Sequence, residues 1–300
     1  MGTAHPPGQP EAVRLLVVQH EEQAGIARFG DWLMEAGADL TVLRPYRAHD
    51  ASRTRRASES GDISEAAQEQ EARAFSEAER SLASGDPQVL VELMADFDGL
   101  IVLGGSPGPW DDAENPWFPT VRHALAASAR GAFPSFNICL GAELLCAAIG
   151  GDIVRRSIPQ VGISQAVVTP SAMADPVFQV LPEEVPVPLW HQDEMAIDAI
   201  DQGVAPTLLL TGTDSPVQAF RVGACAWGTQ FHPESTGEQF AQWGENFAHQ
   251  GKDTTTWGGK ELDTIVQETC LADESLVQNF RPLAEAFVRY VVGFGEAGTG

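Results

Sequence analysis

The chain has 300 residues, of which 43% are apolar and 20% are charged. This composition can fill the core of one large α/β domain or of two modest domains. The 42 acidic residues outnumber the 18 basic ones, giving a formal net charge of −24 at pH 7. A chain this acidic repels phosphate backbones, so nucleic-acid binding is not expected.

The sequence also argues against a membrane protein or a disulfide scaffold. No stretch approaches the roughly 18 uninterrupted apolar residues of a membrane-spanning helix, and the first 15 residues hold no apolar signal-peptide core. The 4 cysteines form no C-x-x-C motif. This cysteine usage suits a reducing compartment, and a cytoplasmic location is expected.

The predicted elements begin with a strand, a helix and a second strand. Residues 1–11 are rich in Pro and Gly and are expected to be disordered. The β-branched run over 13–19 predicts a buried strand, the apolar periodicity over 24–36 a helix, and residues 38–43 another strand. Strand, helix and strand at this spacing indicate a βαβ unit and therefore a parallel sheet.

Residues 47–86 interrupt this alternation with a segment rich in Ala, Ser, Glu, Gln and Arg. A solvated surface insertion is the first interpretation, and a lid over an active site or an arm that docks a partner is the alternative. The α/β pattern then resumes, with helices predicted over 89–95, 121–130 and 140–149 and strands over 97–103 and 134–138.

Shorter strands dominate after residue 160. They are predicted over 164–168, 187–190, 207–210, 217–220 and 225–230. A long amphipathic helix over 275–292 then closes the fold, with Pro282 near its start or at a kink. Without an internal repeat, one domain over 12–294 accounts for the pattern, followed by a flexible tail over 295–300.

A cysteine follows the strand predicted over 134–138, where the next helix begins. A helix N-terminus directs unpaired N–H groups and partial positive charge at a thiol placed there, which favours the nucleophilic thiolate. Gly141 leaves room for the sharp turn that such a nucleophile requires. Cys139 is therefore a candidate nucleophile, although a lone cysteine in an apolar segment is more often a core residue.

A histidine and an acidic residue two positions later follow the strand predicted over 225–230. Pro233 keeps the backbone extended, so the side chains of His232 and Glu234 can point to the same side. Glu234 would then orient the imidazole, and His232 would accept the thiol proton of Cys139. Together these residues predict a Cys-His-Glu triad.

Five segments, in chain order, carry a family resemblance. They are Leu103–Ser106, Trp110–Trp117, Asn137–Glu143, Trp190–Asp193 and Gln230–Glu234. They resemble the L-G-G-P, Y-D-E-x-x-Y-P-W, G-I-C-x-G-x-Q, W-H-G-D and Q-F-H-P-E motifs of class I glutamine amidotransferases, in particular stand-alone proteins similar to the amidotransferase domain of GMP synthase. The resemblance implies a flavodoxin-like, three-layer α/β fold whose mostly parallel central sheet is flanked by helices.

The resemblance also implies roles for individual residues. Cys139 would attack the γ-amide of glutamine or of a γ-glutamyl amide, forming a γ-glutamyl thioester that water then hydrolyses. His232 would pass the proton to the departing ammonia or amine, and the backbone N–H groups of Gly105 and Leu140 would form the oxyanion hole. The implied substrate-binding residues are Gly104, Ser106, Glu143, His191, Gln192 and Asp193. Neither a metal nor another cofactor is expected, because no His, Cys and Asp cluster has ligand spacing.

Several positions depart from the family pattern and leave the substrate open. Glu143 stands where most members have Gln, as it does in folate γ-glutamyl hydrolases, and its carboxylate can pair with an α-ammonium group. Asn137 and Gln192 replace glycines of two motifs. His191 could line the pocket or bond to Asp193 as a structural histidine. Surface ion pairing is expected for His20 beside two glutamates, and buried packing for the remaining cysteines, which are Cys146, Cys225 and Cys270.

Four functions fit these residues to different degrees. The first is a stand-alone thiol amidase that cleaves a γ-glutamyl amide. The second is a glutaminase subunit that supplies ammonia to a separate synthetase, with the insertion over 47–86 as its docking surface. The third is a non-catalytic regulatory protein on the same fold. A cysteine protease of the intracellular-protease type fits less well, since that group carries a histidine after its nucleophile and Leu140 follows Cys139 here.

Overall fold

The computed structural model describes residues 12–48, 76–197, 204–255 and 259–298. The disorder expected over 1–11 and most of the insertion expected over 47–86 lie outside the described residues. The end of that insertion is ordered, since residues 76–83 form a helix.

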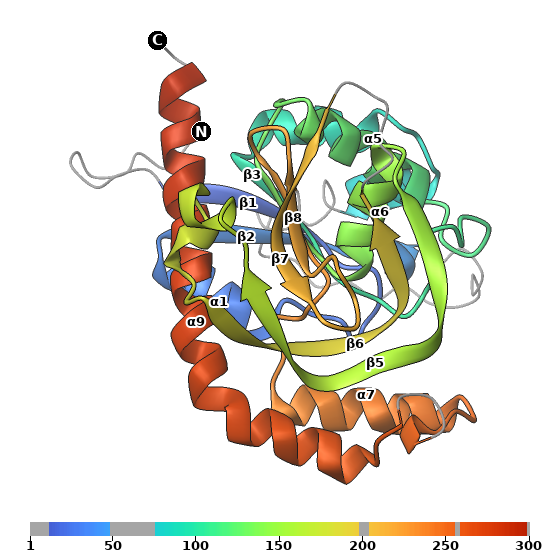
Figure 1. Cartoon of the computed structure of the whole chain (residues 1–300). Coiled ribbons are helices and arrows are strands. Elements are labelled where there is room, and N and C mark those ends of the chain that lie inside the picture. Colours follow the sequence, from blue (N-terminus) through green and yellow to red (C-terminus); the bar gives the residue numbers. More distant parts are fainter. Residues whose placement is uncertain (1–11, 49–75, 198–203, 256–258, 299–300) are drawn as a thin grey trace, which may run out of the picture.

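Within the described residues, the strands form one nine-stranded sheet in the order β2-β1-β3-β4-β9-β8-β7-β5-β6 (Figure 1). The first part of this order is parallel and consists of β2 (Ala38–Leu43), β1 (Val13–Val18), β3 (Gly99–Val102), β4 (Ser135–Ile138) and β9 (Ala226–Thr229). The remainder is antiparallel and consists of β8 (Ala219–Val222), β7 (Pro206–Gly212), β5 (Asp152–Val168) and β6 (Glu184–Ala196). The parallel half corresponds to the mostly parallel sheet expected from the sequence, and the antiparallel half extends it.

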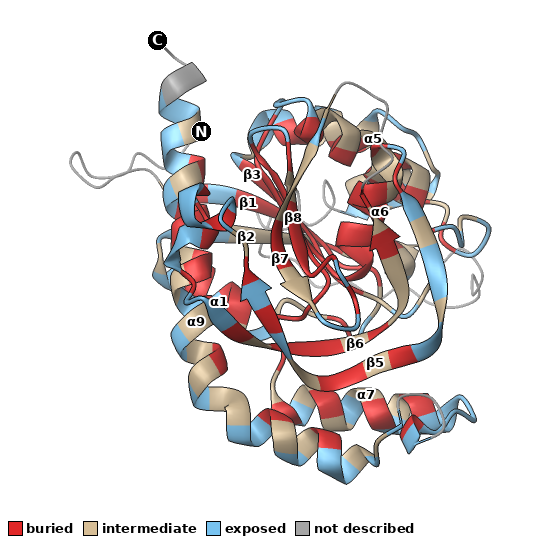
Figure 2. Ribbon diagram, in the orientation of Figure 1, coloured by how far each residue is buried: buried red, intermediate tan, exposed pale blue. Residues whose placement is uncertain are grey.

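Helices cover both faces of the parallel half, which makes the three expected layers. One face packs against α1 (Ala27–Glu35) and α9 (Leu262–Gly298). The other packs against α4 (Val89–Leu93), α5 (Phe118–Ala129) and α6 (Leu140–Ala148). Alternate residues of β1 enter the two cores, Leu15 on one side and Leu16 on the other, so a continuous apolar run was needed here. Figure 2 shows the buried residues concentrated in this sheet and on the inner faces of the helices.

The antiparallel strands are longer than the sequence predicts. The strands expected over 164–168 and 187–190 are the inner parts of the β5–β6 hairpin, which is paired from Asp152 with Ala196 to Val167 with Glu184 and carries an irregularity between Arg155 and Gln160. The first half of β5 is largely exposed and therefore lacks the apolar alternation by which a strand is recognised. Backbone pairing with β6 holds it in place instead.

The helices near the C-terminus also differ from the expectation. The helix predicted over 275–292 is part of α9, which runs over 37 residues from Leu262 to Gly298 and contains Pro282. Residues 295–298, expected in a flexible tail, belong to this helix. A further helix, α7 (Gly237–His249), was not predicted and packs against α9 beneath the β5–β6 hairpin (Figure 1). Short 3₁₀ helices complete the fold at η1 (Met94–Asp96), η2 (Ala172–Ala174) and η3 (Phe178–Val180).

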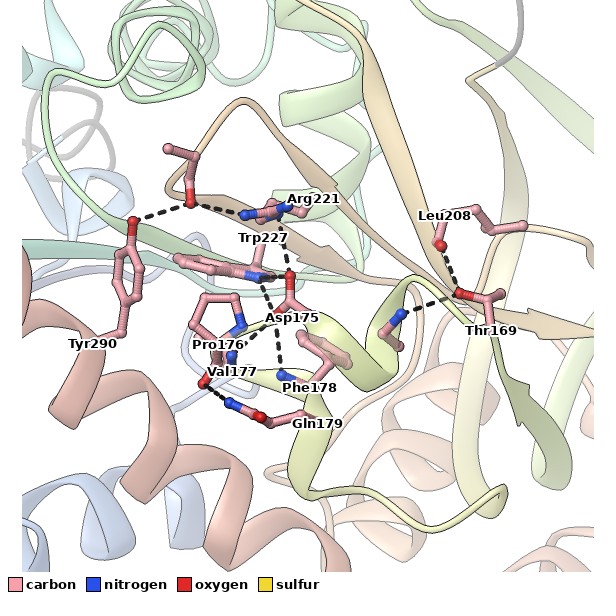
Figure 3. A network of polar contacts seen from close by, with 12 residues as sticks. Thr169, Asp175, Pro176, Val177, Phe178, Gln179, Leu208, Arg221, Trp227 and Tyr290 are labelled. Atoms are coloured by element: carbon pink, nitrogen blue, oxygen red, sulfur yellow. Dashed lines mark hydrogen bonds and ion pairs between the residues drawn. The ribbon is translucent and has the colours of Figure 1, made fainter.

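A buried charge links β8 and β9, the strands at which the antiparallel and parallel halves of the sheet meet (Figure 3). The Asp175 carboxylate accepts hydrogen bonds from the Trp227 indole N–H at 3.1 Å and from the backbone N–H groups that begin η3, and pairs with Arg221 at 3.1 Å. Tyr290 of α9 contacts the Trp227 ring at 4.7 Å. Because β9 pairs directly with β4, this network supports the two strands that lead to Cys139 and His232.

Candidate active site

The sequence-predicted residues meet at one edge of the sheet. The carboxyl ends of β1, β3, β4 and β9, which are adjacent and parallel, lead into Gln19–Glu21, Leu103–Ser106, Cys139 and Gln230–Glu234 respectively. Ligands of α/β proteins bind at this edge because the loops of neighbouring parallel strands converge there.

Cys139 occupies a strained turn between β4 and α6. Its backbone has φ 49° and ψ −108°, a conformation that non-glycine residues rarely adopt and that tends to mark functional turns. The Cys139 N–H still bonds to the Thr229 carbonyl at 2.7 Å, so β9 fixes the turn. A Cβ on Gly141 would lie 2.3 Å from the Val102 carbonyl oxygen; only glycine fits there.

The thiol of Cys139 is almost fully buried. Burial, reinforced by the carboxylates of Glu143 and Glu234, raises the pKa of the Cys139 thiol well above its usual range, against the opposing hydrogen bonds from the Leu140 N–H and from Gln230. This corrects the expectation that the helix N-terminus favours thiolate, since desolvation outweighs it here. The raised pKa favours the thiol form of the sulfur.

His232 and Glu234 form a buried hydrogen-bonded pair. The His232 Nδ1–H donates to Glu234 Oε1 at 2.8 Å, while His232 Nε2 is buried and has no hydrogen-bond partner among the described residues. The His232 N–H bonds to the Pro188 carbonyl at 2.9 Å, and both the N–H and the hydroxyl of Ser235 bond back to the His232 carbonyl. In this loop Glu234 orients the imidazole of His232, and Nε2 is able to accept a proton.

Gly104 and Gly105 allow the loop after β3 to approach these residues. A Cβ on Gly104 would lie 3.1 Å from His232 Cε1 and 3.5 Å from the Cys139 Cβ, and one on Gly105 would lie 3.1 Å from a methyl carbon of Leu140. The sulfur and the imidazole therefore share one space that a side chain on Gly104 would fill. The Gly105 N–H has no backbone acceptor among the described residues.

Glu143 and Gln230 connect the first turn of α6 with the loop after β9. The Gln230 amide donates to Glu143 Oε1 at 3.1 Å and approaches the Cys139 sulfur at 3.8 Å. Burial, with a contribution from the Asp193 carboxylate, raises the pKa of Glu143 to about 7. A charge that changes near neutral pH therefore lies beside the sulfur.

The Trp190–Asp193 segment forms another wall of the site. His191 bonds through Nδ1 to the Asp193 carbonyl at 2.7 Å and through Nε2 to the Gln160 side chain at 2.9 Å, and burial lowers the pKa of His191 to about 4. The two partner atoms are the Asp193 carbonyl oxygen and Gln160 Oε1, which are both acceptors; a neutral imidazole has a single N–H and donates to one of them. His191 is thus tied into the structure while it also lines the cavity. Arg155 binds the Asp193 carboxylate at 2.6 and 2.9 Å.

Residues after β1 hold the glycine loop from its other side. The Glu21 carboxylate accepts from the Ser106 N–H at 3.0 Å and from the Ser106 hydroxyl at 2.6 Å, and burial raises the pKa of Glu21. His20 is buried and accepts a hydrogen bond from the Trp117 indole at 3.0 Å. The surface ion pair expected for His20 is wrong, because Trp117 and the glycine loop cover the ring; burial lowers the pKa of His20 to about 3.

A cavity of about 170 Å³ opens over Cys139. Of the predicted site residues it is lined by Gly105, Ser106, Cys139, Glu143, His191, Gln192, Asp193 and His232. The predicted residues that do not line it lie behind the ones that do: Glu234 orients His232, Gly104 lies beneath Cys139 and His232, and Leu140 follows the sulfur.

The wall formed by α7 and its following turn was not predicted. Trp243, Asn246, Phe247, Gln250 and Lys252 line the cavity, and the Trp243 ring lies 4.8 Å from the His232 ring. Two signals in the sequence point to this helix. Thr236 and Gln239 form a capping box, an N-terminal signature that is visible in the order of the residues alone, and three aromatic residues follow at helical spacing.

The described residues contain neither a metal cluster nor a membrane span. Among them, no three His, Cys, Asp or Glu side chains are arranged to hold a metal ion, and no helix has the length and apolarity to cross a membrane. No cysteine forms a disulfide: Cys146 and Cys225 are buried as expected, but Cys270 is exposed. Cys270 lies on the first part of α9, which packs beside α7 rather than against the sheet, and its side chain is left exposed there.

Comparison with known proteins identifies the family. The sequence profile of the family "Glutamine amidotransferase class-I" matches residues 72–250, a range that contains Cys139, His232 and Glu234. The chain belongs to the class I glutamine amidotransferase family.

Two known proteins are about a quarter identical to this chain over about half of its length. It is 26% identical over 146 residues to the glutamine amidotransferase-like protein YfeJ of Salmonella typhimurium, and 48% of this chain and 59% of that protein are covered. It is 28% identical over 149 residues to a glutamine-hydrolyzing GMP synthase subunit of Sulfurisphaera tokodaii, covering 49% of this chain and 73% of that one. The match thus spans less than two thirds of the YfeJ protein.

Solved amidotransferase structures share the fold. A glutamine amidotransferase from Thermotoga maritima is 17% identical and superposes with a TM-score of 0.66 over 92% of this chain and 98% of that chain. A second, from Methylobacillus flagellatus, is 18% identical with a TM-score of 0.65 over 95% and 96% of the two chains. The three-layer α/β architecture is therefore that of the class I amidotransferases.

Proposed function

We propose that the chain is a cysteine amidase that hydrolyses the γ-amide of glutamine or of a γ-glutamyl amide. The observation that carries this proposal is the placement of the strained Cys139 and the oriented His232–Glu234 pair around one cavity. The family's general chemistry, glutamine amide hydrolysis, supports it.

The geometry supports the following sequence of steps. The Cys139 sulfur attacks the amide carbon while its proton passes to His232 Nε2, and the Gly105 and Leu140 N–H groups stabilise the oxyanion. The intermediate collapses to a γ-glutamyl thioester when His232 returns the proton to the departing ammonia or amine. Water, deprotonated by His232, then attacks the thioester, releasing glutamate and restoring the thiol.

Removal of the nucleophile tests this proposal. We expect Cys139→Ala to lower kcat/KM for the best γ-glutamyl amide by at least about 10³-fold, because the acyl-enzyme of the proposed mechanism forms on its sulfur. The control is Cys270→Ala, which removes an exposed thiol on α9 and should leave turnover unchanged. Full turnover by Cys139→Ala, with no glutamyl adduct in the intact mass of the wild type, would contradict the proposal.

A glutaminase subunit that feeds a separate synthetase is the second candidate. Similarity to glutamine-hydrolyzing subunits of GMP synthase favours it, and its substrate would be glutamine alone. Turnover of the purified chain separates the two. A substituted γ-glutamyl amide hydrolysed faster than glutamine supports the stand-alone amidase, whereas slow hydrolysis of glutamine only supports the second candidate. A non-catalytic role would require that Cys139 fail to react with any glutamine-like electrophile.

A further inference from the structure

The cavity has two walls of different chemistry. Glu143, Arg155 and Asp193 form a charged wall, which adjoins the sulfur through the hydrogen bonds of Gln230 to Glu143 and towards Cys139. Trp190, Trp243 and Phe247 form an aromatic wall. Their rings contact one another edge-on, with centroids 5.9 Å apart between the two tryptophans and 6.0 Å apart between Trp190 and Phe247.

The aromatic wall lies on the side of the base. The Trp243 ring is 4.8 Å from the His232 ring. An amide is cleaved when the general acid protonates its nitrogen, so the leaving amine departs next to the imidazole. In the proposed reaction the amine would therefore leave beside Trp243, and the zwitterionic end of the glutamyl group would face the charged wall.

A cation stands at the outer end of the aromatic wall. The Lys252 ammonium lies 4.9 Å from the centre of the Phe247 ring and lines the cavity. The other charged lining groups already have partners: Glu21 binds Ser106, Glu143 binds Gln230, and Arg155 binds Asp193. Among the described residues, Lys252 has no carboxylate partner. Lys252 is therefore an exposed cation at the edge of the cavity, where its ammonium can attract an anion.

We infer that the leaving group is an amine that carries an aromatic body and a carboxylate, so that the preferred substrates are γ-glutamyl amides of aromatic amino acids. This inference rests on the proposed function. The aromatic body packs against Trp243 and Phe247, as apolar parts of ligands do in concave sites, and the carboxylate pairs with Lys252. Ammonia, the leaving group of glutamine, would leave both subsites unused.

Four substrates separate the two features of the leaving group. They are γ-glutamylphenylalanine, γ-glutamyl-2-phenylethylamide (aromatic without a carboxylate), γ-glutamylalanine (a carboxylate without the ring) and glutamine. We expect γ-glutamylphenylalanine to have the highest kcat/KM and glutamine the lowest, with a gain of at least about tenfold from the ring, since even small apolar groups are discriminated by such factors. A kcat/KM for glutamine equal to or above that of γ-glutamylphenylalanine would overturn the inference.

Lysine variants test the anion subsite. Lys252→Met should lower kcat/KM for γ-glutamylphenylalanine and γ-glutamylalanine by about two- to fivefold, the range of an exposed ion pair, and leave the phenylethylamide unchanged. Lys260→Met is the matched control, because Lys260 pairs with Glu268 at 2.6 Å and does not line the cavity. Equal losses on all four substrates with Lys252→Met would place Lys252 at the glutamyl carboxylate and contradict the inference.

A substitution in the aromatic wall gives an independent check. Phe247→Leu keeps an apolar side chain and should lower the ratio of kcat/KM for γ-glutamylphenylalanine to kcat/KM for γ-glutamylalanine. An unchanged ratio of γ-glutamylphenylalanine to γ-glutamylalanine would count against the aromatic subsite. Failure of the proposed function is distinguishable from all these results: no substrate would be hydrolysed, and the intact mass would show no thioester at Cys139.

Discussion

At the scale of single residues, the protonation of Glu143 affects the pKa of the proposed nucleophile, Cys139. Its carboxylate is buried, accepts a hydrogen bond from Gln230 and has a pKa raised to about 7 by burial. When ionised it is one of two carboxylates that raise the pKa of the Cys139 thiol. Within the proposed function, the ionised carboxylate would also pair with the α-ammonium group of the substrate. The residue thus opposes thiolate in the empty site and favours substrate binding.

Glu143→Gln removes this charge and keeps the hydrogen bond to Gln230. Because the folded-state pKa of about 7 lies above the ordinary value of 4.5, the folded protein binds the proton more tightly. The free energy of unfolding should therefore fall as the pH rises from about 4.5 through 7, by up to about 3 kcal/mol. We expect the variant to lack this decline in urea unfolding and its Cys139 to be alkylated faster at pH 8. Identical pH profiles of wild type and variant would disprove the assignment.

At the scale of elements, α7 matters because it supplies a wall of the cavity. Its N-terminus is fixed from two sides. The Thr236 hydroxyl accepts from the Gln239 N–H at 3.3 Å while the Gln239 side chain accepts from the Thr236 N–H at 3.0 Å. Arg28 of α1 donates to the Ser235 carbonyl and pairs with Asp273 of α9 at 2.5 Å. The loop carrying His232 and Glu234 is thereby held between three helices.

Loss of the cap should weaken this element. We expect Thr236→Ala to lower the free energy of unfolding by about 1 kcal/mol, since an N-terminal N–H group of α7 loses its acceptor. Chemical denaturation measures the effect, and Thr236→Ser is the control because it restores the hydroxyl. If the alanine and serine variants unfold at the same denaturant concentration, the capping box contributes no stability to α7.

At the scale of the whole molecule, a few buried polar groups hold the two halves of the sheet together. Asp175, whose side chain is fully buried, joins η3, β8 and β9 through Arg221 and Trp227, and Tyr290 brings α9 against the same ring. Such a buried ion pair adds little to the free energy of unfolding compared with an apolar replacement of both partners. The loss of one partner, however, leaves an uncompensated charge and unpaired N–H groups in the interior.

Asp175→Ala should therefore destabilise the protein by about 3 kcal/mol or more. The matched control is Glu35→Ala, which breaks an exposed ion pair to Arg281 and should cost at most about 1 kcal/mol. Thermal and urea unfolding of the two variants give the comparison. A loss for Asp175→Ala no larger than that for Glu35→Ala would show that the network is energetically dispensable.

Much of this organisation follows from the sequence itself. The strand, helix and strand at the start of the chain predicted a parallel sheet, and the cysteine after β4 predicted the edge that carries the candidate site. In the structure β1 is buried on both faces, and only glycine fits at Gly141. The family motifs predicted which side chains gather at that edge, and the cavity contains most of them. The sequence was sufficient to predict those features that depend on the residues of a single segment.

Other features were decided by tertiary contacts. The polar first half of β5 is a strand only because β6 pairs with it, and His20 is buried only because Trp117 and the glycine loop close over it. The raised pKa of Cys139 likewise depends on desolvation by distant segments, which outweighs the local helix terminus. The sequence determined which candidate reactive groups the chain carries. Packing between segments far apart in the chain determined the charge and the orientation of these groups, and it formed the aromatic wall that they face.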